Sequence, residues 1–219
     1  ADYPILGTIA QINAFALGAQ MTNPRAKVYL EWSTLKEQDI EKRIDEIDPN
    51  CISGKDIIVP DDNNHFYGVY HRESGGGEQK NLAMPLCHWG KFYEELIRTI
   101  MAGNWEQDND VEKAINYWWG MPTGVVDVIC SKKLPAGTVR LVNVLKHNYK
   151  TGQFHTFTDQ MYAQGHILKE KKGETLSPEE VIEMDWLAEN IIGRIPKIEE
   201  LQEQAKPVLT QQGIETRKG

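Results

Sequence analysis

Two features of the sequence have residue types that could act on a substrate: Cys87 next to His88, and the glycines at 75–77. A cysteine beside a histidine suggests a thiol nucleophile with its general base. However, neighbouring residues at a helix start point about 100° apart, so they rarely make the hydrogen bond that activates the thiol. The glycines suggest a phosphate-binding loop, yet no Lys-Ser or Lys-Thr follows them. The sequence therefore predicts that the protein is not an enzyme.

The cysteines and histidines lack the spacing of a metal site. Cys51, Cys87 and Cys130 lie far apart and include no CxxC pair. Their odd number does not describe a disulfide framework, so free and buried thiols are expected. No HExxH-like spacing occurs among five histidines, His65, His71, His147, His155 and His166. The sequence predicts no bound metal and no cofactor.

The composition predicts a globular chain with an excess of acidic residues. Of its 219 residues, 40% are hydrophobic and 26% are charged, which is enough for one or two compact units. The net charge of −8 argues against a nucleic-acid partner, because such a partner requires a basic surface. No apolar run approaches the ~20 residues of a membrane span. Residues 1–4 do not resemble a natural start, so the lack of a leader says nothing about export.

The hydrophobic pattern alternates between helices and strands along the chain. Ile9, Ile12 and Phe15 have helical spacing, and Ser177 with Glu180 matches a capping box at a helix start. Helices are predicted for residues 8–20, 36–47, 86–102, 135–150, 177–191 and 198–205, and strands for residues 27–32, 56–60, 66–70, 124–130 and 154–157. This alternation predicts an α/β fold with a mostly parallel sheet.

Several segments occur together in the order that a known family shows. Residues 12–19 read INAFALGA and are followed by NP-x-AKV at 23–28. Further matching segments are residues 89–93 (WGKFY), 103–105 (GNW), 124–127 (GVVD), 150–157 (KTGQFHTF) and 176–186 (LSPEEVIEMDW). Together they resemble the basic-membrane-protein family of ABC-transporter solute-binding lipoproteins, of the purine-nucleoside receptor type. In that family the INAFALGA segment lies in the middle of the chain, so the sequence is expected to be the C-terminal portion of a receptor with most of its first lobe absent.

The resemblance implies a type I periplasmic-binding-protein fold, in which two Rossmann-like lobes close on a ligand. Residues 1–176 would form a three-layer αβα ligand-binding lobe, built from the second lobe and returning elements of the first. Residues 177–219 would form a C-terminal helical segment with a polar tail. Ligands in such folds bind beyond the carboxyl ends of the strands, and the candidate contacts are taken from loops at such ends.

Two candidate contacts come from the first two of these loops. Tyr3 matches an aromatic residue in the family's G-F-x-P-like turn and would stack on a purine while its hydroxyl forms a hydrogen bond. Equally, Tyr3 would pack at a frayed terminus. Asp56 would accept hydrogen bonds from a ribose or an amine, or alternatively cap a turn. The family has a helix after this position that is missing here.

The third loop, residues 67–73, departs from the family at Arg72. It lines up with the family's Y-A-V-G-Y-D-S-D segment, whose first Asp grips the ribose hydroxyls, and Arg72 takes that position beside His71. A guanidinium only donates hydrogen bonds, so the usual ribose recognition should be lost and a carboxylate or phosphate would be favoured. Alternatively, Arg72 is a surface residue paired with Glu73. Trp89, which starts the WGKFY segment, completes the predicted ligand contacts.

The sequence therefore predicts an extracellular solute-binding receptor fragment of an ABC importer, lipid-anchored at the cell membrane in the full-length protein. Its ancestral ligand is a purine nucleoside, or now an anionic relative, held in an interlobe cleft that is incomplete in this portion. The expected partners are the ABC permease, the missing first lobe and a second copy of the chain, because apolar faces between residues 89 and 127 need covering. The alternative is a sensory or interaction module of a larger receptor, with an altered or inactive pocket.

Overall fold

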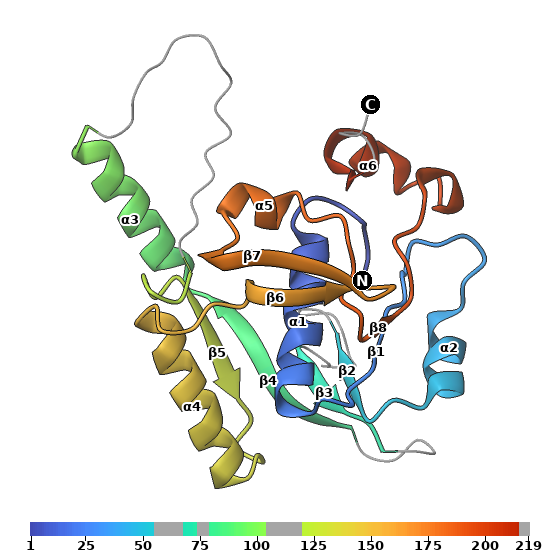
Figure 1. The fold of residues 1–219 in the computed structure, drawn as a ribbon, viewed down its shortest axis with the longest axis horizontal. Helices are drawn as coiled ribbons and strands as arrows, with labels where there is room; N and C mark the ends of the chain where they lie inside the picture. Colours follow the sequence, from blue (N-terminus) through green and yellow to red (C-terminus); the bar gives the residue numbers. More distant parts are fainter. Residues whose placement is uncertain (55–67, 74–78, 104–119, 215–219) are drawn as a thin grey trace. The chain divides into compact units, whose positions relative to one another are not determined.

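The computed structural model describes residues 1–54, 68–73, 79–103 and 120–214 (Figure 1). The chain divides into two compact units. The first unit comprises Ala1–Glu46 and His155–Gly219, and the second unit comprises Ile47–Phe154. The C-terminal residues from 177 onward, which the resemblance sets apart as a separate segment, therefore share a compact unit with residues 1–46.

The first unit combines helices with two pairs of strands. β1 (Val28–Tyr29) pairs in parallel with β8 (Ile191–Ile192). β6 (Thr158–Ala163) and β7 (Ile167–Thr175) form an antiparallel hairpin. Its turn holds Gly165 and His166 at positive φ, 77° and 59°. The helices are α1 (Thr8–Thr22), α2 (Ile40–Ile47), α5 (Pro178–Ile182) and α6 (Lys206–Gln212), with a short 3₁₀ helix, η1, at Ile198–Glu200.

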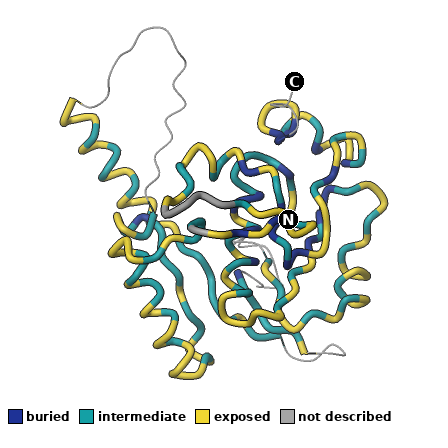
Figure 2. The backbone as a smooth tube through the Cα atoms, viewed as in Figure 1, coloured by how far each residue is buried: buried dark blue, intermediate teal, exposed yellow. Residues whose placement is uncertain are grey.

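Apolar side chains from α1, from the segment after β1 and from the segment before β8 form the core of this unit. Ile9, Trp32 and Ala188 lie in this core with almost no exposure to solvent. A smaller cluster of Leu201, Ala205 and Leu209 packs beside α6. Figure 2 shows the buried positions gathered in these segments. Each large side chain buried in this way contributes about 1.5–3 kcal/mol, so this core holds the first unit together.

Asn13, from the INAFALGA segment, is a polar residue inside this core with no solvent exposure. Its Nδ2 donates to the carbonyl oxygen of Trp186 at 2.7 Å, and its Oδ1 accepts from the backbone nitrogen of Ala188 at 2.9 Å. A buried amide that is paired with backbone groups costs little and fixes one geometry. The helix predicted for residues 8–20 is confirmed as α1, and Asn13 ties it to the chain that leads into β8.

The second unit contains a four-stranded sheet and two helices. Its strands are β2 (Cys51–Ser53), β3 (Val69–His71), β4 (Lys80–Cys87) and β5 (Val126–Cys130), in the order β2-β3-β4-β5. Each neighbouring pair is antiparallel. The helices α3 (Trp89–Met101) and α4 (Ala136–Lys150) contain no buried residue. Val125 is the sole buried hydrophobic side chain among the described residues of this unit.

The predicted α/β class is confirmed, but the direction of strand pairing differs from the prediction. Within the described residues, β1 and β8 are parallel and the other pairs are antiparallel. The reason is clearest between β3 and β4. Only eight residues connect His71 to Lys80, whereas a parallel crossover needs a dozen or more. The alternation of helices and strands along the sequence does not contain this connection length, so it could not predict the direction of pairing.

Several predicted boundaries also shift. The helix predicted for 86–102 begins at Trp89 because residues 80–87 form β4. The helix predicted for 177–191 ends at Ile182. The predicted burial of the thiols is wrong for Cys51 and Cys87, which are exposed because they lie on strands of the thinly covered second unit. None of the described helices is both long and apolar enough to span a membrane.

Candidate ligand-binding pocket

A pocket of about 230 Å³ lies at the carboxyl ends of the parallel strands β1 and β8 in the first unit. Residues 29–32, which end and follow β1, line one wall, and residues 192–194, which end and follow β8, line the other. Leu35, Arg43 and Pro196 complete the lining. The crevice beyond the carboxyl ends of parallel strands is where ligands bind in open α/β folds. The position of this pocket therefore makes it the candidate site.

Gly193 allows the two walls of the pocket to approach each other. Its φ is 149°, and a Cβ atom at this position would lie 2.8 Å from the carbonyl oxygen of Leu30. Gln164 fixes the backbone of residues 191–193, because its Nε2 donates to the carbonyl oxygens of Ile191 and Gly193, each at 2.9 Å. Trp32, which is 2% exposed, donates from its indole nitrogen to the carbonyl oxygen of Arg194 at 2.8 Å. These contacts give the pocket a fixed backbone.

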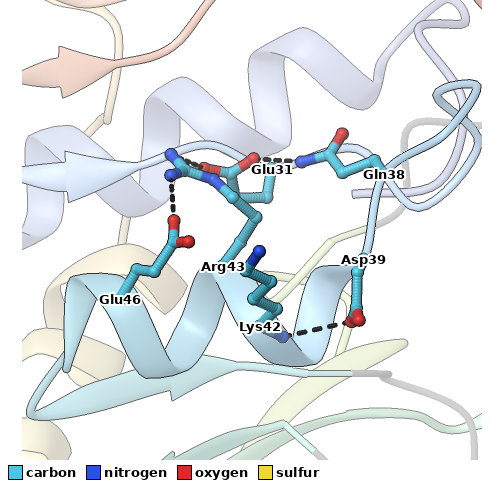
Figure 3. A network of polar contacts seen from close by, with 6 residues as sticks. All are labelled: Glu31, Gln38, Asp39, Lys42, Arg43 and Glu46. Atoms are coloured by element: carbon cyan, nitrogen blue, oxygen red, sulfur yellow. Dashed lines mark hydrogen bonds and ion pairs between the residues drawn. The ribbon is translucent and has the colours of Figure 1, made fainter.

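The charged side chains of the pocket are paired with one another or with neighbours. Glu31 accepts from the Nη2 atom of Arg43 at 3.0 Å and from the side-chain amide of Gln38 (Figure 3). Arg43 also reaches Glu46 at 2.7 Å. Its hydrogen bonds to Glu46 and Glu31 raise the pKa of Arg43 above the ordinary value of an arginine. Arg43 therefore stays ionised near neutral pH.

The second guanidinium of the pocket, on Arg194, is also compensated. Its Nη1 atom donates to a carboxylate oxygen of Glu200 at 2.6 Å, and its Nη2 atom contacts the other oxygen. The hydrogen bond from Arg194, followed by one from the backbone of Lys197, lowers the pKa of Glu200 to about 2. Because each arginine of the lining has a carboxylate partner, the pocket offers donors and acceptors without a large net charge.

The four predicted contacts that the structure describes do not line this pocket. Tyr3 packs against the cluster of Leu201, Ala205 and Leu209 in the first unit. Asp56 lies outside the described residues. His71 ends β3, where its Nδ1 atom lies 2.7 Å from the carbonyl oxygen of Asn50, and the backbone nitrogen of Arg72 donates to the same oxygen. Trp89 is 60% exposed and lies edge-to-face on Phe92, with ring centroids 5.9 Å apart.

Among the described predicted contacts of the second unit, Trp89 lies far from His71 and Arg72. His71 lies opposite Lys80 at the start of β4, whereas Trp89 follows the end of β4 at Cys87. Seven steps along a strand span roughly 23 Å. Antiparallel pairing places successive carboxyl ends at opposite edges of the sheet, so it separates residues that a parallel sheet would have gathered. The ligand roles of Tyr3, Asp56, His71, Arg72 and Trp89 stay predictions.

Part of the observed pocket could have been found from the sequence. Residues 29–32 end the strand predicted for 27–32, and the carboxyl end of a predicted strand is where a ligand is expected. The opposite wall was missed because residues 177–191 were assigned to one helix, which concealed β8 and the turn at Gly193. Cys87 ends β4 and His88 directly precedes α3, and neither lines this pocket. Within the described ranges, no three His, Cys, Asp or Glu side chains are grouped to hold a metal ion.

Comparison with known proteins finds relatives that are named as binding proteins. No protein-family model matches the chain. A purine-binding protein of Brucella abortus is 24% identical over 205 residues, which are 89% of this chain and 57% of that protein. A protein of Haloferax volcanii, named as an ABC transporter glucose-binding protein, is 30% identical over 137 residues, 57% of this chain and 33% of that protein.

The chain therefore spans about half or less of the length of the relatives it matches. Both relatives are named as binding proteins, not as enzymes. The longer match runs through nearly all of the chain and so includes most of the segments that carry the family resemblance. These matches agree with the resemblance that the motifs carry: the chain is similar to a purine-binding protein and to a glucose-binding protein of an ABC transporter.

Proposed function

We propose that this chain is the ligand-binding part of an extracellular solute-binding receptor of an ABC importer, with a purine or purine nucleoside as its ligand class. The observation that supports this most is the pocket at the carboxyl ends of β1 and β8. The names of the relatives, one purine-binding and one in ABC transport, support the same assignment. In the intact protein the receptor would be lipid-anchored at the cell surface and would deliver its ligand to the permease.

The chemistry of the lining suits a neutral, planar ligand. Tyr29 is 48% exposed and offers an aromatic face with a hydroxyl, which can stack on a purine and still form a hydrogen bond. Glu31 offers carboxylate acceptors for an N–H or ribose O–H group, and Arg43 offers donors. An anion would have to compete with Glu31 and Glu46 for the Arg43 guanidinium. The anionic ligand that Arg72 suggests is therefore less well supported than a neutral one.

Ligand-observed NMR at millimolar adenosine, adenine and D-glucose tests this function. Because a receptor of this kind uses contacts from two lobes, we expect weak binding of adenosine or adenine, with no calorimetric signal below millimolar concentration. Tyr29→Ala should abolish the weak signal, while Tyr162→Ala, which removes an equally exposed tyrosine from β6 of the same unit, should retain it. Absence of binding by any purine, or binding unaffected by Tyr29→Ala, would contradict the proposal.

The alternative function, an interaction module of a larger receptor, has one observation in its favour. α3 exposes a row of large apolar side chains, including Tyr93, Ile97 and Met101. A row of this kind is typical of a surface that binds another protein. A second copy of the chain is the partner that the sequence predicts. Protein of a single, monomeric mass in solution would count against that partner.

A further inference from the structure

We propose that Arg43 is a positioning residue that couples the pocket to α2, the helix through which the chain passes from the first unit into the second. The ligand-dependent part of this inference rests on the proposed function, whereas the coupling itself does not. Two observations support it: the way α2 is held in place, and the identity of the groups that hold Glu31.

The first observation is that α2 has little burial of its own. It contains eight residues and no buried side chain, and its isoleucines at 40, 44 and 47 are half-buried. A helix of about two turns is marginal in water unless tertiary contacts stabilise it. The boundary between the two units falls between Glu46 and Ile47, inside this helix. Polar contacts to the first unit therefore add to the half-buried isoleucines in stabilising α2.

The second observation is that both described partners of the Glu31 carboxylate come from α2 or the residues just before it. One carboxylate oxygen pairs with Arg43 at 3.0 Å and the other accepts from Gln38 (Figure 3). The Glu31 side chain is 21% exposed and lines the pocket, as does Arg43. The same guanidinium bonds Glu46 at the far end of the helix. Arg43 thus joins the pocket wall to the last turn of α2.

This arrangement predicts how a ligand acts on the helix. A ligand in the pocket displaces water from around Glu31 and Arg43, and an ion pair with less water around it is less screened. The carboxylate still has lone pairs for a ligand donor, because its two oxygens accept about four hydrogen bonds. Occupancy of the pocket should therefore stabilise α2 through Arg43.

Amide hydrogen exchange of residues 38–46 in the unliganded protein tests the coupling directly. Arg43→Gln and Glu31→Gln should each accelerate exchange in this segment by about two- to fivefold, the range for a partly exposed ion pair. The double variant should be no faster than Arg43→Gln alone, since Arg43→Gln already removes the Arg43–Glu31 pair. Lys42→Gln is the matched control, because it removes the same charge from the same helix without contacting the pocket lining. Exchange at β1 and β8 reports whether each variant keeps its fold.

Unchanged exchange in Glu31→Gln would overturn the coupling, even if Arg43→Gln were faster, because that effect would then come from Glu46 alone. Repeating the measurement with millimolar adenosine separates this inference from the proposed function. We expect adenosine to slow exchange in α2 of the wild type and of Lys42→Gln but not of Arg43→Gln. If adenosine protects Arg43→Gln equally, the coupling is wrong while the binding function stands. If the variants behave as expected without ligand but no purine binds, the binding function is wrong while the coupling stands.

Discussion

The two units are built from the same kinds of element but differ in how they bury apolar side chains. The first unit has a core that includes Ile9, Trp32 and Leu201, and its buried asparagine, Asn13, is paired with backbone groups. The second unit has a longer sheet and two long helices, yet neither α3 nor α4 buries a residue. The amount of regular secondary structure in a unit of this chain therefore does not indicate how many apolar side chains that unit buries. The pocket lies in the unit with the core, where its walls can be held rigidly.

A matched pair of tryptophan substitutions gives the largest expected contrast between the units. Trp32→Ala removes a fully buried ring and its hydrogen bond to Arg194, and should lower the free energy of unfolding by about 3–5 kcal/mol. Trp89→Ala removes a ring that is mostly exposed, and should cost about 0.5 kcal/mol or less. Urea unfolding followed by circular dichroism measures both. Equal losses would mean that the second unit has a core comparable to the first.

Two glycine substitutions should give a smaller contrast with opposite signs. Gly193→Ala forces a Cβ atom against the backbone of Leu30 at a positive φ, and should destabilise the first unit by about 1–3 kcal/mol. Gly137→Ala lies in α4, where the nearest atom to a new Cβ is 4.0 Å away on a flexible arginine. It should stabilise the protein by about 0.4–1 kcal/mol. Retained purine binding in Gly193→Ala would show that the close approach of the pocket walls is not needed.

Some features of the two units were predictable from the sequence and others were not. α1 was predicted almost to its ends because its apolar residues repeat at helical spacing around Ile9 and Ile12. The wall formed by β8 was missed because two residues, Ile191 and Ile192, are too few to give a strand period, and the helical start at Ser177 appeared to continue through them. Pairing direction depends on connection length, which the alternation of elements does not contain. The predicted contacts were placed by analogy to a parallel sheet, and in the antiparallel sheet His71 and Trp89 lie toward opposite ends of β4.

The first unit should lose stability at acid pH through Glu200. Its pKa is lowered to about 2 in the folded protein, mainly by Arg194, so the folded state prefers the ionised form more than the unfolded state does. This contribution is fully present above the ordinary glutamate value of about 4.5 and is lost as the pH falls toward 2. Glu200→Gln should flatten the decrease in unfolding free energy over that range. Glu199→Gln, which removes a neighbouring exposed carboxylate and leaves this pair intact, should keep the slope. An unchanged slope in Glu200→Gln would show that the Arg194–Glu200 pair does not contribute to the pH dependence of stability.

The smallest expected effect on stability comes from the apolar row on α3, where the effect on association should be large instead. Met101 is 82% exposed and Ile97 is 55% exposed, so changing both to glutamine removes little folded-state burial and should alter the free energy of unfolding by about 0.5 kcal/mol or less. Exposed apolar rows of this length rarely stay in contact with water, and we expect light scattering to show a wild-type mass above that of one chain. The double variant should return the mass to a monomer, whereas Met21→Gln, which changes an exposed methionine at the end of α1 in the first unit, should not. A monomeric wild type would mean that the second unit is stable with this row uncovered, and the difference in burial between the two units would then have no consequence for assembly.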